Sequence, residues 1–562
     1  MSRKQLPAVI EADYTEIDTP AEMGFGGAVE GAERLTRETM TWAAPMVSPD
    51  RAINLVKGEA DARTRDMAIN DGYSQGAVRI QKNGIVGSQY RLNAKPDYRV
   101  IYGKDTRAAQ EYGEELAAVA EARFNLAAQS EDAWFDRGGM MNFTEQVRLV
   151  VGSCVLTGEA FGTAEWDDDD TGRPFKTCIQ MVAPDRVCNL DGLPDDNISP
   201  NRRRRRGIIT DRYGKPVSFE IRREHPSEWY DVEGALWDTV PVAKPWGRKQ
   251  VLFIREALQI DQTRGLAEMV AALQHCRMTK KFSEITLQNA VINASYAAAI
   301  ESELPNHEVV AAMGGGTDGW VNAVGQYMAM LQGYLGKADN IKIDGAKMPH
   351  LFPGTKLNMM PMGTPGGVGT DFEAALLRKI AATLGVSYAD LSRDFARVSY
   401  SGLKGELAIA ERDTDVKKKV WADRWATGVY RLWFEEEMAA GNLPLPPGRN
   451  RTDFYRPLMK DAYTRCTWIG TSRGQIDEMK ETQAALLRIA GGLSTYEKES
   501  ARLGEDYREV FAQRAKEERQ IKEMGLTFTN GAKVASSGAG TGGQQNNRNN
   551  GTNDNGSDDD EE

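Results

Sequence analysis

The residues best suited to covalent or metal chemistry are few and scattered in this chain. It has five cysteines and four histidines. Their positions are Cys154, Cys178, Cys188, Cys276, Cys466, His225, His275, His307 and His350. No Cys-x-x-Cys spacing occurs and no histidine lies near a pair of cysteines, which disfavours a zinc site. An odd number of widely spaced cysteines is typical of reduced thiols, so we expect a cytoplasmic protein.

Motifs for nucleotide chemistry are also missing. The nearest approach to a Walker loop is Gly336-Lys337-Ala338, which lacks the hydroxyl residue that would hold magnesium and the upstream glycine. No Gly-x-Gly-x-x-Gly follows a predicted strand. We therefore predict that the protein is not an enzyme and needs no cofactor and no metal.

Two runs of like charge have two readings each. The acidic run Asp167–Asp170 has the ligand type for a divalent cation, but consecutive carboxylates outside an EF-hand frame do not converge on one ion, so a solvated hairpin turn is favoured. The run Arg202, Arg203, Arg204, Arg205 and Arg206 suits DNA phosphate or an acidic partner surface. An exposed loop without a partner explains the arginines equally well.

The totals restrict the class of protein. A chain of 562 residues with 41% hydrophobic and 27% charged residues is typical of two to four globular domains. No window approaches eighteen consecutive apolar residues, and the N-terminus lacks a secretory signal, so we expect no membrane span. The net charge of −11 argues against a protein that grips DNA phosphates tightly. It remains compatible with a protein that lets DNA slide past.

The elements that would position such a surface stand out in the second half of the chain. Residues 262–301 contain no proline and have helical apolar spacing, which predicts a helix roughly 55–60 Å long. Its exposed faces are expected to pack on neighbouring subunits. Residues 357–370 form a Pro/Gly/Met loop, and Thr370 with Glu373 fits a capping box that would begin a helix ending at Gly385.

The rest of the chain alternates between helical and β-rich stretches. Predicted helices cover residues 61–71, 74–83, 106–129, 143–155, 400–440 and much of 475–524, and the helix over 400–440 has a tryptophan-rich face (Trp421, Trp425 and Trp433). Strands are predicted at residues 90–94 and 157–166, followed by short β-type runs over 173–254. We predict a flexible arm over residues 1–48 and a disordered acidic tail over 529–562.

Several segments in order carry a family resemblance. They include Asn70-Asp-Gly-Tyr-Ser-Gln-Gly-Ala77, Asp261-Gln-Thr-Arg-Gly265, Pro353-Gly-Thr-Lys-Leu-Asn358, Leu384-Gly-Val-Ser-Tyr-Ala-Asp-Leu-Ser-Arg393 and Gly492-Leu-Ser-Thr-Tyr-Glu-Lys-Glu499. The chain resembles the portal proteins of tailed bacteriophages, specifically the lambda-like family, from about residue 48 to 525. The N-terminal arm and the Asn/Asp-rich tail lie outside the resemblance.

The resemblance implies a function without chemistry of its own. It implies a homo-dodecameric ring at one capsid vertex that conducts double-stranded DNA, without sequence specificity, during packaging and ejection. The implied partners are the terminase large subunit, the major capsid protein and scaffold, and the head-completion or connector proteins, with no membrane. The implied location is the virion, after assembly in the bacterial host cytoplasm. The alternatives are a nucleic-acid-processing packaging enzyme subunit and another head–tail adaptor ring, whose subunits are normally much shorter.

The resemblance also implies a fold and a division of the chain. The expected fold is α+β and mainly helical, with wing, stem, clip, tunnel and crown regions. Placed on the segments above, these are the wing (50–140 and 302–356), the stem helix with its lead-in strand (143–172), the clip (173–254), the long stem helix (262–301), the tunnel loop and helix (357–385), the wing–crown connection (386–450) and the crown (451–525).

Two sets of site residues follow from that division. The tunnel-loop residues expected to face DNA are Lys356, Asn358, Met359, Met360, Met362, Thr364 and Lys379. The two lysines would place sparse positive rings beside the DNA backbone, and the methionines would give an adaptable contact surface. The run Arg202–Arg206 would face the terminase.

Overall fold

The computed structural model describes residues 41, 44–170, 172–228, 236–296, 329, 341–343, 346–348, 368–395, 399–446, 448–472, 474 and 477–526. The chain divides into two compact units, Met1–Glu478 and Met479–Glu562. The fold is α+β and mainly helical, as predicted. Within the described part, no helix is long and apolar enough to cross a membrane.

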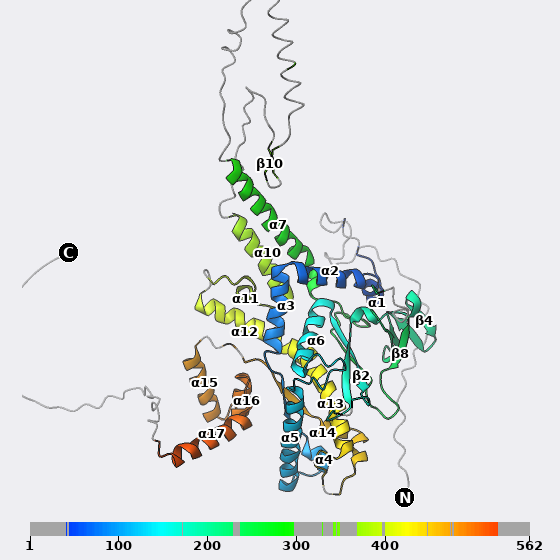
Figure 1. The fold of residues 1–562 in the computed structure, drawn as a ribbon, viewed down its shortest axis with the longest axis vertical. Helices are drawn as coiled ribbons and strands as arrows, with labels where there is room; N and C mark the ends of the chain where they lie inside the picture. The colour runs from blue at the N-terminus through cyan, green and yellow to red at the C-terminus, as the bar shows by residue number, and fades with distance from the viewer. Residues whose placement is uncertain are drawn as a thin grey trace, which may run out of the picture. The chain divides into compact units, whose positions relative to one another are not determined.

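Unit 1 begins with five helices among the described residues (Figure 1), and side chains cap all of them except α2. They are α1 (Pro49–Asn54), α2 (Lys57–Asn70), α3 (Gly72–Ile85), α4 (Tyr98–Tyr102) and α5 (Arg107–Ala128). Asp71 ends α2 and caps α3 by accepting a hydrogen bond from the Ser74 amide at 2.8 Å. The predicted stop at Asn83 is wrong by two residues, because α3 continues to Ile85. Strand β1 (Arg91–Ala94) pairs antiparallel with β12 (Cys466–Ile469), far away in the sequence.

A three-stranded sheet and two helices form the centre of unit 1. The sheet has the order β3-β2-β9, made of β2 (Glu159–Trp166), β3 (Thr177–Val182) and β9 (Val251–Arg255). Helices α6 (Phe143–Thr157) and α13 (Asp423–Ala440) share one hydrophobic cluster with it. The tryptophan face predicted over residues 400–440 lies in this cluster, and Trp421, Trp425 and Trp433 are buried.

The region 173–254 is β-rich, as predicted, but it is divided between two sheets. Its first and last strands, β3 and β9, flank β2 in the central sheet. The strands between them form a five-stranded antiparallel sheet, β4-β5-β6-β7-β8. Their bounds are β4 (Asp196–Ser199), β5 (Arg202–Arg205), β6 (Ile208–Asp211), β7 (Pro216–Arg222) and β8 (Trp237–Pro241). Short 3-10 turns at Pro184–Arg186 and Leu190–Gly192 lead into this sheet.

The predicted helix over 400–440 is a helix with an irregular turn. It consists of α12 (Tyr400–Lys417), a π-helical turn (Lys418–Ala422) and α13. A π-turn inside a helix rotates the following side chains relative to the preceding ones. After α13 come a 3-10 helix (Arg451–Tyr455) and α14 (Met459–Tyr463), and α11 (Tyr388–Ser392) precedes α12.

The long helix predicted from residue 262 begins later. The structure places α7 at Met269–Tyr296, and residues 297–301 lie outside the described residues. Gln262 and Arg264, which precede it, are buried in a non-helical segment. The prediction of a helical start at 262 is wrong. The non-helical segment lets Arg264 form a buried ion pair with Glu159 and donate to three main-chain carbonyls.

The helix that follows the predicted loop begins earlier than expected. Helix α10 covers Val368–Leu384, so Thr370 is inside the helix instead of capping it. The predicted end is confirmed, since Gly385 follows Leu384 with φ +63°. The short strands β10 (Ile341–Ile343) and β11 (Ala346–Met348) form a separate antiparallel pair.

Unit 2 is a small helical unit. Its helices are α15 (Glu478–Ala490, which begins at the last residue of unit 1), α16 (Tyr496–Arg502) and α17 (Tyr507–Glu523). Glu499 of α16 receives hydrogen bonds from Arg488 and Arg502, which ties α16 to α15. The ion pairs and the neighbouring Ser494 lower the pKa of Glu499 to about 2.

Candidate functional site: a helix pair and its attachment to unit 1

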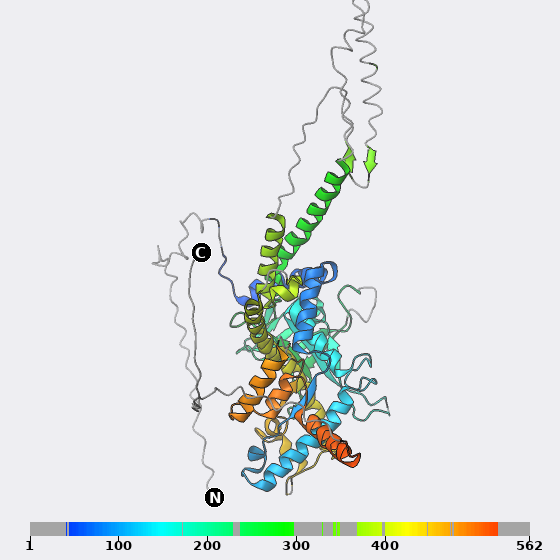
Figure 2. The ribbon, with the colours of Figure 1, turned by 90° about the vertical axis from the view of Figure 1, so that its left-hand side faces the viewer.

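Helices α7 and α10 form an antiparallel pair that extends away from the sheets of unit 1, as both ribbon views show (Figures 1 and 2). The contact face near its base is apolar and consists of Met269, Ala272, Cys276, Leu377, Ile380, Ala381 and Leu384. Farther out, the rings of Phe282 and Phe372 lie 5.4 Å apart. We call α7 and α10 the helix pair.

The base of α7 is held by four buried charged side chains, Lys57, Asp61, Glu159 and Arg264, called here the basal ion cluster. Arg264 donates to Glu159 Oε1 at 2.5 Å, and Lys57 Nζ lies 3.1 Å from the same oxygen and 2.9 Å from Asp61 Oδ2. Arg264 also donates to the main-chain carbonyls of Pro184, Val187 and Arg206. The cluster thereby joins α2, β2 and the segment that leads into α7.

The pKa values of the two acids in the basal ion cluster are shifted in opposite directions. Burial alone would raise the pKa of Glu159, but the charges of Arg264 and Lys57 outweigh it and hold the pKa below its usual value. Burial raises the pKa of Asp61 to about 6, because it outweighs the ion pair with Lys57 and the weaker effect of Arg264, and the charge of Glu159 adds to the rise.

The main chain closes tightly around this cluster. Gly158 has φ +75°, and a Cβ placed there would lie 2.3 Å from the main-chain carbon of Leu266. A Cβ on Gly265 would lie 2.1 Å from the carbonyl oxygen of Gly158. The end of α6 and the start of the α7 segment therefore meet backbone to backbone, which requires glycine on both sides.

A second attachment holds the end of α10. Lys417 of α12 donates to the carbonyl of Leu384 at 2.9 Å and to Glu268 Oε2 at 2.5 Å. Gln81 of α3 donates to the same carbonyl at 2.8 Å. One buried lysine thus connects α12 with both helices of the pair, since Glu268 immediately precedes α7.

Most of the predicted tunnel-loop residues cannot be placed. Lys356, Asn358, Met359, Met360, Met362 and Thr364 lie outside the described residues. Lys379 is described and is exposed on α10. It is therefore the single member of that set located on the helix pair.

The arginine run is divided by the structure. Arg204 is half-buried and bonded to Glu220 at 3.0 Å, Arg205 donates to the Asp196 carbonyl, and Arg206 donates to the Asn54 carbonyl at 2.7 Å. These three stabilise the five-stranded sheet and its contact with α1. Arg202 and Arg203 are exposed. The alternative of an exposed loop does not hold for Arg202–Arg205, because these residues form strand β5.

The acidic run is a hairpin turn between β2 and β3. Asp167 pairs with Arg137 and Arg173, and Asp168 pairs with Lys176. Within the described ranges, no group of three or more His, Cys, Asp or Glu side chains could hold a metal ion. All five cysteines are free thiols.

One motif that the sequence reasoning missed is Gly72-Tyr73-Ser74-Gln75-Gly76, which has the spacing of a serine nucleophile elbow. The structure gives it another role. It follows a helix instead of a strand, and Ser74 is fully buried with its hydroxyl bonded to Asp71 at 2.6 Å. The segment is therefore a helix start.

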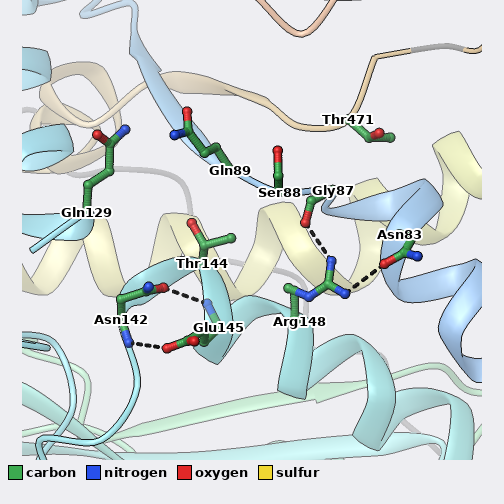
Figure 3. Close-up of a pocket in the computed structure, with 10 residues that line it drawn as sticks. All are labelled: Asn83, Gly87, Ser88, Gln89, Gln129, Asn142, Thr144, Glu145, Arg148 and Thr471. Atoms are coloured by element: carbon green, nitrogen blue, oxygen red, sulfur yellow. Dashed lines mark hydrogen bonds between the residues drawn. The ribbon is translucent and has the colours of Figure 1, made fainter. Parts of the chain in front are cut away.

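A pocket of about 650 Å³ lies between α3, α6 and the chain after β12 (Figure 3). Its polar groups largely satisfy one another. Arg148 donates to the Gly87 carbonyl at 2.5 Å and to Asn83 at 2.7 Å, and Asn142 and Glu145 form the capping box of α6. Gly87 lies close to Thr471, where a Cβ would collide, so the glycine has a packing role. The lining residues of the pocket show no catalytic arrangement.

The outer part of α7 differs from its base. Met278, Ile285, Leu287 and Val291 are 53%, 44%, 67% and 52% exposed. By helical spacing Met278 and Ile285 share one face of α7, and Leu287 and Val291 share the opposite face. Exposed apolar side chains of this kind are typical of interaction surfaces.

Sequence reasoning missed the buried charged residues at both attachments, namely Lys57, Asp61, Glu159, Arg264 and Lys417. Gly158-Glu159 and Arg264-Gly265 each place a glycine beside a charged residue, which is a signal for a close backbone approach. The helical reading of residues 262–301 obscured it.

Comparison with known proteins defines the class. A family model described as "Phage portal protein, lambda family" matches residues 35–417. The chain belongs to the lambda family of phage portal proteins, a family of structural components of the phage particle.

Named relatives support the same assignment. The portal protein of Escherichia phage N15 is 32% identical over 512 residues, covering 90% of each chain. Portal protein B of Escherichia phage lambda is 31% identical over 513 residues, covering 90% of this chain and 89% of that protein. A probable portal protein of Halomonas phage phiHAP-1 is 20% identical over 495 residues, covering 85% and 83%.

Solved structures similar to this chain come from gene transfer agent particles. A chain in the neck of an empty particle has a TM-score of 0.33 at 13% identity, covering 79% of this chain and 93% of that one. A chain in the neck of a native particle, computed with C12 symmetry, has a TM-score of 0.32 at 12% identity, covering 81% and 98%.

Proposed function

We propose that twelve copies of this chain close into a ring at one capsid vertex and conduct double-stranded DNA. The observation that carries this proposal is the uncovered apolar surface of α7 (Met278, Ile285, Leu287 and Val291) on a helix pair attached firmly at its base. Side-by-side packing of helix pairs around an axis would cover these side chains and leave a central channel.

The helix pair suits the role of the stem. The sequence had assigned α6 and the long helix to that role, but α6 is buried against the central sheet, and α10 is the helix that packs along α7. A stem of α7 and α10 is therefore the better proposal. Lys379, with Lys356, would place a few positive charges beside DNA. The loop residues Asn358, Met359, Met360, Met362 and Thr364 would supply an adaptable lining.

The remaining partners follow from the same role. Arg202 and Arg203, the exposed members of the arginine run, are the proposed contacts for the terminase large subunit. The ring would assemble in the host cytoplasm with scaffold and the major capsid protein, and would later bind head-completion proteins. The chain would carry out no chemistry and hydrolyse no ATP.

The test is electron microscopy with native mass measurement of the purified chain and of a Leu287→Asp variant. The unchanged chain is expected to give rings of twelve with an open channel. A charge at position 287 would be buried between copies, so the variant is expected to lose rings while its circular dichroism stays unchanged. The matched control is Leu126→Asp, which places the same charge at an exposed position of α5. Rings that form equally well in the Leu287→Asp variant would contradict the role of α7.

The channel lining needs its own measurement. The double variant Lys356→Ala with Lys379→Ala is expected to change the length of packaged DNA or the course of ejection. Unchanged packaging and ejection would exclude the two lysines as DNA contacts.

A further inference from the structure

The central sheet has one closed edge and one open edge. On the β3 side, the Arg137 amide donates to the Ile179 carbonyl at 3.0 Å and the Ile179 amide to the Phe135 carbonyl at 2.9 Å, which closes that edge. The outer edge of β1 in the two-stranded β1-β12 sheet is also closed, because Asn125 and Glu121 of α5 accept hydrogen bonds from the Leu92 and Ala94 amides. Among the described strands, β9 pairs only with β2.

The register identifies which groups of β9 are unpaired. Ala164 donates to the Gln250 carbonyl at 2.8 Å, so by antiparallel alternation Leu252 and Ile254 bond to β2. Val251, Phe253 and Arg255 then face outward. The Val251 amide reaches the Val242 carbonyl at 3.4 Å, whereas Phe253 and Arg255 have no outward backbone partner among the described residues. An unpaired edge of this kind is a template for another strand.

Four cations flank this edge. A Cβ on Gly428 of α13 would lie 2.7 Å from Leu252, so Gly428 marks where α13 touches β9. Arg424 and Arg431 lie one helical turn to either side of Gly428 on the same face of α13. Lys249 and Arg255 lie three residues to either side of Leu252.

The charges of this group are poorly compensated. Arg431 pairs with Asp461, but the side chains of Lys249, Arg255 and Arg424 make no hydrogen bond or ion pair within the described residues. Desolvation and the nearby Arg431, Arg424 and Lys460 lower the pKa of Lys249, although its side chain reaches solvent. Desolvation and Arg424 likewise lower the pKa of Arg255. Asp50 and Glu159 oppose this effect at Arg255, and Asp461 opposes it at Lys249, without forming an ion pair with either cation. Cations without an ion-pair partner beside an open strand edge favour an extended acidic partner.

The N-terminal arm contains a segment with that chemistry. Residues Ile10-Glu-Ala-Asp-Tyr14 alternate apolar and acidic residues, and Thr15-Glu-Ile-Asp18 adds two more acids. In a strand this alternation places Glu11 and Asp13 on one face, whereas Glu16 and Asp18 fall on the opposite face. The C-terminal end of the arm joins α1 close to β9, because Asp50 of α1 is near enough to influence the pKa of Arg255. Residues 19–48 would span roughly 30 Å as a flexible chain, enough to return to β9.

We propose that residues 10–18 of the N-terminal arm add as a strand to the open edge of β9 in the same chain, with the carboxylates of Glu11 and Asp13 against Lys249, Arg255 and Arg424. The new strand would bond the Phe253 and Arg255 amides and neutralise the cations. This inference does not depend on the ring or on DNA conduction.

The experiment is amide hydrogen exchange at Phe253 and Arg255 in the full chain, read by mass spectrometry. Protection is expected in the unchanged chain and at least tenfold faster exchange in Glu11→Lys with Asp13→Lys. The matched control, Glu30→Lys with Glu33→Lys, makes the same charge change in the same arm and is expected to keep the protection. Equal exchange in all three chains would overturn the proposal and leave the edge for another protein.

Two further experiments test whether the N-terminal arm pairs directly with β9 and whether it comes from the same chain. Lys249→Glu with Arg424→Glu is expected to expose the amides, and combining it with the reversed arm is expected to restore protection. Failure of that rescue would overturn direct pairing. In mixtures of isotope-labelled reversed-arm chains and unchanged chains, the labelled amides are expected to stay exposed. Their protection by unchanged neighbours would overturn the intrachain assignment.

Discussion

Near its start, α7 continues from a segment whose charged side chains are buried and paired, whereas its outer part exposes apolar side chains. At the base, Arg264 and Glu159 are essentially inaccessible and each has several polar partners. Farther out, Leu287 is 67% exposed. The base therefore has its polar partners within one chain, whereas the proposed ring would cover the outer part with another chain. Substitutions at the base should lower the free energy of unfolding, whereas substitutions in the outer part should prevent ring formation.

The largest effect is expected from Arg264→Met. It leaves Glu159 buried with Lys57 as its only cation and with Asp61 nearby, and breaking a buried pair in this way costs about 3–5 kcal/mol. The free energy of unfolding, measured with urea below the concentration that forms rings, is the readout.

Its control is Arg63→Met, which removes an exposed pair with Glu59. Exposed pairs contribute about 0–1 kcal/mol, so this variant should unfold like the unchanged chain. Similar losses for the two substitutions would contradict the difference between a buried base and an ordinary surface.

Elements with strong local signals were predictable from the sequence. Helix α5 follows the predicted range within one residue, because Thr106 caps it and its apolar positions keep a helical period. Strand β2 and the burial of Trp425 and Trp433 were likewise predictable from pattern. Each of these depends on neighbours in the sequence.

The attachments of the helix pair depend on residues far apart in the chain, so no local pattern contains them. Arg264 meets Glu159 across 105 positions, and Lys417 meets Glu268 across 149. A charged residue in a helical pattern is normally expected on the solvent side, and Arg264 and Lys417 both depart from that rule. The arginine run shows the converse, since five identical residues have different surroundings once β5 is paired with β6.

An intermediate effect is expected from Gly158→Ala, compared with Gly103→Ala. Both glycines end a helix in the left-handed region, with φ +75° and +70°, so both variants incur about 1–2 kcal/mol of backbone strain. At Gly103 the added Cβ meets open space, whereas at Gly158 it collides with Leu266. Gly158→Ala should therefore lose about 1–3 kcal/mol more, as overpacking typically does. Equal losses in urea unfolding would show that the backbone contact at the base can relax.

The smallest effect is a pH dependence located at the base of α7. The pKa of Asp61 is about 6 in the folded chain and near 3.8 when unfolded. The folded state thus binds more protons between pH 4 and 6, and stability contributed by Asp61 falls as pH rises through that window and levels off near pH 7. The size of this change in stability is on the order of 2 kcal/mol.

Glu159, with its lowered pKa, acts in the opposite direction and below about pH 4.5. Glu268 and Asp390 also have raised pKa values, so the informative quantity is the difference between the unchanged chain and Asp61→Asn. Their stability curves should diverge between pH 4 and 7 and run parallel above it. Parallel curves throughout would mean that the ion pair with Lys57 keeps Asp61 ionised, and would contradict a pH dependence at the base of α7.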